Sequence, residues 1–110
     1  MFAQSHASGN TFHVIGVIIP IESDDDDRWI TWAGRELARR FGRAQSVAGV
    51  AGWALDGEAG VSPVVIVHSY PSEITELDRT ILFGIGWQVY LGLGRRKGTA
   101  VIIDDDTIAF

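Results

Sequence analysis

The side chains best suited to bind a ligand or a partner lie between residues 28 and 39. On an α-helix at 100° per residue, four of them fall within about 60° of one another: Arg28, Trp32, Arg35 and Arg39. Guanidinium groups beside an indole can stack on it, or can bind an anionic partner such as an acidic protein surface. We therefore predict that this basic–aromatic helix face binds a partner protein. The alternative is a solvated helix face, in which Glu36 pairs with Arg40.

Two runs of aspartates, residues 24–27 and 104–106, offer carboxylates to a metal ion. Paired carboxylates can hold Mg²⁺ for phosphoryl chemistry, and Asp24 or Asp26 would then serve a nuclease. Each run also has a structural explanation. The first follows Ser23 and suits a helix N-terminus, where side-chain oxygens cap free amides and negative charge matches the helix dipole. The second ends a strand. We expect neither run to hold a metal, and we expect no cofactor.

Histidine and serine chemistry has little support in the sequence. His6 lies in a polar leader, whereas His13 and His68 lie in predicted strands, where a hydrogen-bonded structural histidine is the common situation. The Ser69–Tyr70 pair lacks the pattern of a nucleophile elbow. The glycine-rich stretches lack the lysine of a phosphate-binding loop. We predict no catalytic residue.

Composition limits the class of protein. The chain has 110 residues, 46% of them apolar, a formal charge of −5 and no cysteine. Its length suits one globular domain, and the lack of cysteine agrees with a reducing compartment. The negative charge argues against general nucleic-acid binding. The longest apolar run, residues 14–21, is too short to span a bilayer, so we expect a cytoplasmic protein without membrane contact.

The elements that must position these side chains follow one another as strand, helix, strand, strand, helix, strand. A flexible leader is expected at residues 1–11, and a single domain at residues 12–110. Predicted strands cover residues 12–21, 44–55, 61–70 and 99–103, with a turn at Asp56–Gly57. One helix is predicted from the first aspartate run to Phe41, stopped by Gly42. A second opens at residues 71–73, capped by Ser72, and ends near residues 87–91.

This order predicts an α+β domain of the ferredoxin-like split βαβ type (order βαββαβ). Its four-stranded antiparallel sheet would carry both helices on one face. Strand 12–21 and the runs 64–67 and 101–103 are apolar on both alternating sides, whereas a solvated sheet face alternates with polar residues. We therefore predict a homodimer formed through the open sheet face.

The stretch ELARRFG (residues 36–42), followed by Gly52–Trp53 and Asp56–Gly57, resembles a pattern in small uncharacterised bacterial proteins of ferredoxin-like type. In that pattern a helix ends in Phe-Gly-Gly and a hairpin carries Gly-Trp; Arg43 replaces the second glycine here. The resemblance covers roughly the first half of the chain and implies the fold, without any catalytic residue.

The function predicted from these observations is a noncatalytic protein-interaction module that acts as a homodimer. The alternative is a small dimeric enzyme of ferredoxin-like build. Such an enzyme would be a metal-dependent nuclease using Asp24 or Asp26, or a cavity enzyme enclosed by its tryptophans.

Overall fold

The computed structural model describes residues 12–55 and 58–110. The expected leader with His6, and the predicted turn at Asp56–Gly57, lie outside the described residues. At residues 51, 53–55 and 58 only the backbone is described.

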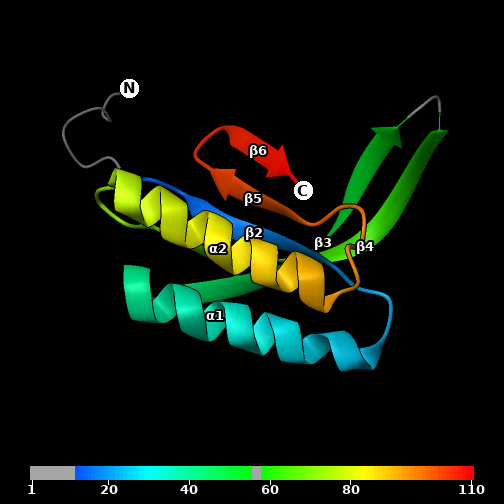
Figure 1. Cartoon of the computed structure of the whole chain (residues 1–110), viewed down its shortest axis with the longest axis horizontal. Helices are drawn as coiled ribbons and strands as arrows, with labels where there is room; N and C mark the ends of the chain where they lie inside the picture. Colours follow the sequence, from blue (N-terminus) through cyan, green and yellow to red (C-terminus); the bar gives the residue numbers. More distant parts are fainter. Residues whose placement is uncertain (1–11, 56–57) are drawn as a thin grey trace, which may run out of the picture.

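Two helices lie on one face of a five-stranded antiparallel sheet (Figure 1). The strands are β2 (Ile15–Pro20), β3 (Ala44–Leu55), β4 (Glu58–Ser69), β5 (Ala100–Ile103) and β6 (Asp106–Ala109). The helices are α1 (Asp27–Phe41), which follows the short 3-10 turn η1 (Asp24–Asp26), and α2 (Glu76–Gly92). The sheet order is β3-β4-β2-β5-β6, so β2 is central, as its apolar sequence predicted.

The first helix and its stop are confirmed. The helix α1 ends at Phe41, and Gly42 follows with a φ of 89°, a left-handed conformation that a residue without a Cβ adopts at little cost. The aspartate run supplies η1 and the first residue of α1, at the positive end of the helix dipole.

The predicted start of the second helix is wrong. Helix α2 begins at Glu76 and its cap is Thr75, not Ser72. The amide of Asp78 donates to Thr75 Oγ1 at 3.1 Å, and the amide of Thr75 donates to Asp78 Oδ2 at 2.9 Å. These reciprocal bonds satisfy two amides that have no partner within the helix, and Ser72 offers no such pair.

The predicted count of four strands is also wrong. The second aspartate run ends β5 and turns the chain back, with Asp104 at a φ of 53°. Residues 106–109 then pair with β5 as the additional edge strand β6. The sheet of the described residues therefore has five strands and not four.

The hydrophobic core lies between the helices and the sheet face that they cover. Its fully buried members alternate along β2 and recur at helical spacing in α1 and α2; among them are Ile15, Val17, Ile19, Leu37, Leu82 and Val89. Burying each such side chain contributes roughly 2 kcal/mol. This core fixes the position of α1 against α2, and with it the relative position of their outer surfaces.

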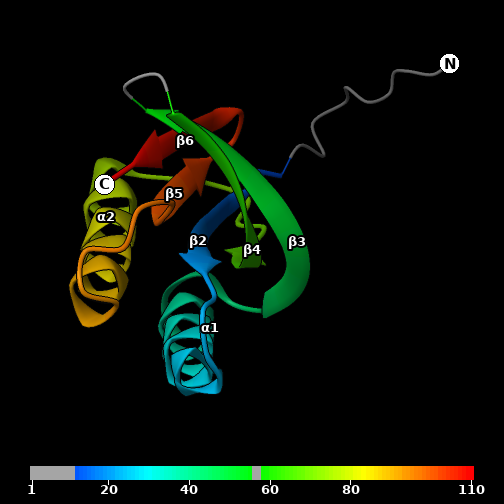
Figure 2. The same ribbon diagram turned by 90° about the vertical axis from the view of Figure 1, so that its right-hand side faces the viewer.

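The β3–β4 hairpin continues beyond the rest of the sheet. The two strands pair over their whole length, whereas β2 pairs only with residues 64–69 of β4. Figure 2 shows the long β3 curving past the other strands. The projecting part carries Val50 and Val61, exposed to 70% and 74%.

Within the described residues, no helix is long and apolar enough to cross a membrane.

Candidate functional site

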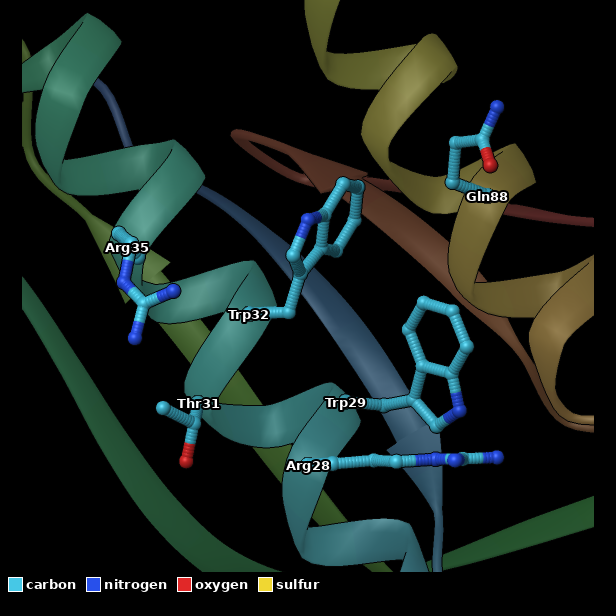
Figure 3. Close-up of a pocket in the computed structure, with 6 residues that line it drawn as sticks. All are labelled: Arg28, Trp29, Thr31, Trp32, Arg35 and Gln88. Atoms are coloured by element: carbon cyan, nitrogen blue, oxygen red, sulfur yellow. The ribbon is translucent and has the colours of Figure 1, made fainter.

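A pocket of about 660 Å³ lies against the outer surface of α1, on the side near α2 (Figure 3). Five of its lining residues come from α1 and one comes from α2: Arg28, Trp29, Thr31, Trp32, Arg35 and Gln88. Two of the six are arginines and none is acidic, so the pocket carries positive charge beside two large aromatic surfaces.

The structure brings together three of the four residues of the basic–aromatic helix face. Arg28, Trp32 and Arg35 line the pocket, because spacings of four and three residues place them on neighbouring turns of α1. Arg39 lies outside it. Its Nη1 atom is 3.1 Å from Glu36 Oε2. Glu36 therefore pairs with Arg39, whereas the alternative interpretation expected it to pair with Arg40.

Arg40 instead joins the two helices. Its Nη2 atom is 2.8 Å from Asp78 Oδ1, at the start of α2. The pKa of Asp78 is lowered, first by the hydrogen bond from the Thr75 amide and then by that from Arg40. This pair holds the last turn of α1 to the first turn of α2.

Trp29 and Trp32 form an aromatic corner. Their ring centroids are 5.7 Å apart and their planes are inclined by 77°. The guanidinium carbon of Arg28 lies 5.7 Å from the centroid of the Trp29 ring, within the range of a cation–π contact. The Trp29 ring packs directly on α2 at Gly92, where any Cβ atom would overlap it.

Trp29, Thr31 and Gln88 are the three pocket residues that the sequence analysis missed. Trp29 is adjacent to Arg28 but points towards α2 (Figure 3), between the exposed stripe and the core. Gln88 comes from the other helix, and only the packing of α2 on α1 brings it to the pocket. The glycine at position 92 was a usable signal for Trp29, because a glycine within a helix often marks a close approach of another group.

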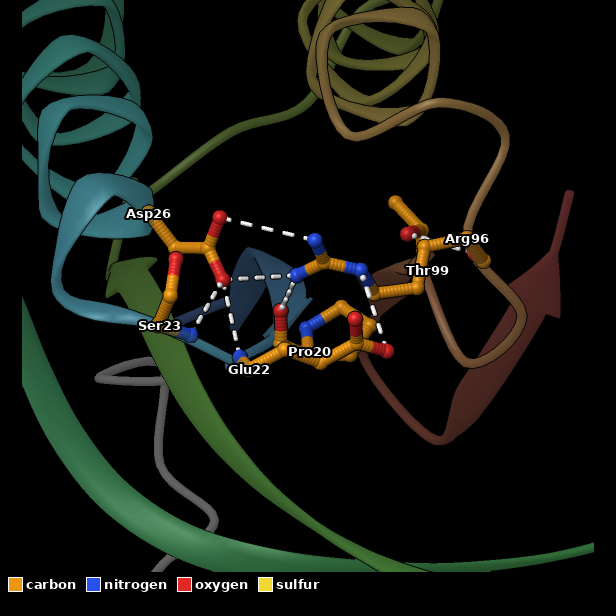
Figure 4. Close-up of polar contacts among 6 residues, drawn as sticks. All are labelled: Pro20, Glu22, Ser23, Asp26, Arg96 and Thr99. Atoms are coloured by element: carbon orange, nitrogen blue, oxygen red, sulfur yellow. Dashed lines mark hydrogen bonds and ion pairs between the residues drawn. The ribbon is translucent and has the colours of Figure 1, made fainter.

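Of the two aspartates considered for a nuclease, Asp24 is exposed and Asp26 is held in a structural ion pair (Figure 4). Asp26 is nearly buried, and its Oδ2 atom lies 2.7 Å from Nη1 of Arg96. The same oxygen accepts hydrogen bonds from the amides of Glu22 and Ser23. The hydrogen bond from Arg96 is the main cause that lowers the pKa of Asp26 to about 2, against the opposing effect of burial.

Neither aspartate run forms a metal cluster in the part of the chain that the structure describes, where no group of three or more suitable side chains converges. Asp104 of the second run binds His13, with 3.0 Å between its Oδ2 and His13 Nδ1. This hydrogen bond is the first cause of the lowered pKa of Asp104. His13 therefore ties the start of the domain to the turn between β5 and β6.

His68 has a different environment from His13. Its ring packs edge-on against Tyr70, with 5.1 Å between the centroids. Its Nδ1 atom is buried without a hydrogen-bond partner in the described residues. The two histidines are therefore engaged separately, and they form no acid–base pair.

No protein-family model matches this sequence, and no curated relative matches it. The chain shares its fold with a phage SAM lyase. The structure of that enzyme in complex with S-methyl-5′-thioadenosine superposes with a TM-score of 0.62 at 13% identity, covering 100% of this chain and 95% of that chain. Its apo state gives a TM-score of 0.62 at 14% identity, with 100% and 94% covered. At this identity the likeness shows the fold alone.

The predicted noncatalytic interaction module is contradicted by this comparison. An enzyme has the same fold over almost its entire length. The alternative drawn from the sequence, a small enzyme, agrees better with the finding.

Proposed function

We propose that this chain is a small enzyme that binds a ligand of the S-adenosylmethionine type and cleaves it, releasing S-methyl-5′-thioadenosine. The observation that carries the proposal is the full-length similarity to phage SAM lyase in complex with that thioadenosine. The pocket beside α1 supports it, because indole faces stack on nucleobases and guanidinium groups bind carboxylates. This corresponds to the cavity enzyme considered from the sequence. Asp26, in contrast, is engaged by Arg96, which speaks against the nuclease.

The chemistry of a sulfonium suits a pocket of this composition. As an oxygen of the substrate's own carboxylate bonds to the amino-acid carbon beside sulfur, the bond from that carbon to the sulfonium sulfur breaks and its electron pair goes to sulfur. The sulfur part leaves as a neutral thioether, and the amino-acid part closes to a lactone. The leaving group takes up no proton. The lining residues include no carboxylate and no imidazole, so the pocket contains no general acid that would supply a proton. Arg28 and Arg35 supply positive charge that can hold the substrate carboxylate at the pocket.

The proposal is tested by incubating the purified protein with S-adenosylmethionine and measuring S-methyl-5′-thioadenosine by chromatography and mass spectrometry. We expect its formation well above the rate in buffer. Trp32→Ala removes a stacking surface and should lower kcat/KM roughly tenfold to a hundredfold.

Trp87→Ala is the matched control, because Trp87 is an exposed tryptophan of α2 that contacts Tyr90 and Phe110 and does not line the pocket. This variant should keep the activity of the wild type. A wild-type protein that forms the thioadenosine no faster than buffer would show that the proposal is wrong.

We also propose that the ferredoxin-like arrangement underlies the sheet, with β6 added at its edge. The order β3-β4-β2-β5 of the other four strands supports this. The similarity of residues 36–42 to small bacterial ferredoxin-like proteins stays a prediction.

We further propose that the protein is a homodimer whose copies meet through the open sheet face. That face carries a row of apolar side chains across four strands, formed by Val47, Ile66, Ile18 and Ala100. In this row Val47 is 51% exposed, Ile18 and Ile66 are half-buried, and Ala100 is buried. The adjacent edge strand β3 has no charged residue to oppose pairing with another chain.

A further inference from the structure

The positive charge of the pocket has no acidic partner. Four other arginines pair with carboxylates: Arg39 with Glu36, Arg40 with Asp78, Arg79 with Glu76 and Arg96 with Asp26. Arg95, in the loop after α2, forms no such pair with a described residue, but it does not line the pocket. Arg28 and Arg35 form no such pair with any described residue. Arg28 lies over the Trp29 ring instead. An arginine beside a pocket without an internal partner is available to an anionic group of a ligand.

The two sides of the pocket offer different chemistry (Figure 3). Towards α2 lie the aromatic corner and the amide of Gln88. A glutamine amide matches the edge of adenine, donating to its N7 and accepting from its amino group, while an indole stacks on the ring. On the other side of α1 lie Thr31 and Arg35, four residues apart and therefore neighbours on the helix surface. A hydroxyl and a guanidinium together can donate to both oxygens of one carboxylate.

We infer that the pocket recognises the two ends of an adenosine–amino acid ligand separately. The adenine lies at the aromatic corner with Gln88, and the amino-acid carboxylate lies at Arg35 and Thr31. This assignment rests on the proposed function and gives roles to residues of the same pocket. Arg35 then distinguishes ligands that keep the carboxylate from those that lack it. The thioadenosine product loses this contact, which favours its release.

Two thioethers isolate the contact, because neither carries the sulfonium charge. S-adenosylhomocysteine keeps the amino-acid carboxylate, and S-methyl-5′-thioadenosine lacks it. Their dissociation constants are to be measured by calorimetry with the wild type, with Arg35→Gln and with Arg39→Gln. Arg39 is the matched control, because it lies one turn further along α1 and binds Glu36 outside the pocket.

We expect Arg35→Gln to weaken the binding of S-adenosylhomocysteine roughly tenfold to a hundredfold, the effect of losing a hydrogen bond between charged groups. Binding of the thioadenosine should stay within about twofold of the wild type. Arg39→Gln should change neither constant. Trp32→Ala should weaken both ligands by a similar factor.

Other outcomes would contradict the carboxylate assignment, the adenine assignment or the proposed function separately. If Arg35→Gln weakens both thioethers equally, or leaves S-adenosylhomocysteine unaffected, the assignment of the carboxylate to Arg35 is wrong while the proposed function stands. If Trp32→Ala weakens only S-adenosylhomocysteine, the adenine does not lie at the aromatic corner. A wild-type protein that binds neither thioether contradicts the proposed function itself. Circular dichroism of each variant confirms that it is folded.

Discussion

The guanidinium of Arg96 holds together three segments of the chain (Figure 4). Its Nη1 atom donates to the carbonyl of Pro20 at 2.8 Å and to Asp26 Oδ2 at 2.7 Å. Its Nε atom lies 3.4 Å from the carboxylate of Glu22. One side chain from the loop after α2 therefore fixes the end of β2 and the start of α1. Because Asp26 and Arg96 are both largely buried, removing one partner leaves the other charge without compensation.

The pH dependence of stability should report this ion pair. The folded state holds the pKa of Asp26 at about 2, below its ordinary value of 3.8, so ionised Asp26 favours folding. This contribution is complete above about pH 5 and is lost as the pH falls through 4 towards 2; it amounts to about 2 kcal/mol. We expect urea unfolding of the wild type to show this loss, and Asp26→Asn to lack it.

The control for this measurement is Asp24→Asn, because Asp24 is an exposed residue of the same aspartate run. It should keep the acid-dependent loss of the wild type. Identical slopes for Asp26→Asn and the wild type between pH 5 and 2 would contradict the assignment.

At the scale of elements, the contact between α1 and α2 depends on a residue without a side chain. The Trp29 ring occupies the space that a Cβ atom at Gly92 would need. Gly84 lies in the same helix, but a Cβ atom there would meet nothing within 4 Å. Position 92 therefore requires a glycine, whereas position 84 has room for a side chain.

We expect Gly92→Ala to displace Trp29 and to lower the free energy of unfolding by about 1–3 kcal/mol, the usual effect of overpacking. The tryptophan fluorescence should shift as the aromatic corner opens. Gly84→Ala should raise stability by up to about 1 kcal/mol, because alanine favours a helix more than glycine does. A Gly92→Ala variant as stable as Gly84→Ala would show that Trp29 does not pack on α2.

The sequence predicted elements well where a single segment carries the signal. The helix from the aspartate run to Phe41 and the strand at residues 44–55 were found because apolar spacing and Gly42 mark them locally. Strand β6 (Asp106–Ala109) was missed because it is short and exposed, and because its strand conformation depends on pairing with β5. The start of α2 was misplaced because Ser72 and Thr75 are both acceptable caps, and only the Asp78 contact selects Thr75.

The candidate site was likewise predictable only where its residues belong to one element. Arg28, Trp32 and Arg35 share one helix face, so helical spacing sufficed to group them. Gln88 reaches the pocket through the packing of α2, which no local spacing encodes. The class of function was beyond the sequence, because the likeness to the phage SAM lyase is apparent only in the arrangement of all the elements.

At the scale of the whole molecule, the pocket and the proposed dimer surface lie on different sides. The pocket lies on the outer surface of the helices, whereas the row containing Val47 lies on the sheet face that the helices leave open. Binding of a ligand and association of two copies can therefore occur together without competing for the same residues.

We expect light scattering to give a mass of twice 12.0 kDa for the wild type. Val47→Glu should give a monomer, because it places a charge in an apolar interface. Val61→Glu is the control, because alternation along the paired strands places Val61 on the opposite side of the hairpin from Val47. Both residues are exposed valines, Val61 to 74% and Val47 to 51%. A monomeric wild type at micromolar concentration would exclude the dimer.

The position of the Arg96 contacts has a consequence for how the molecule opens. Asp26 precedes Trp29 by less than one helical turn, and Arg96 follows Gly92, the last residue of α2, by four residues. Segments on both sides of the aromatic corner are therefore close in the chain to the Arg96–Asp26 contact. When acid protonates Asp26, the backbone amides at the start of α1 and the end of α2 should exchange their hydrogens with solvent as one cooperative unit, while those of β2 stay protected. The ligand pocket would then open before the protein unfolds.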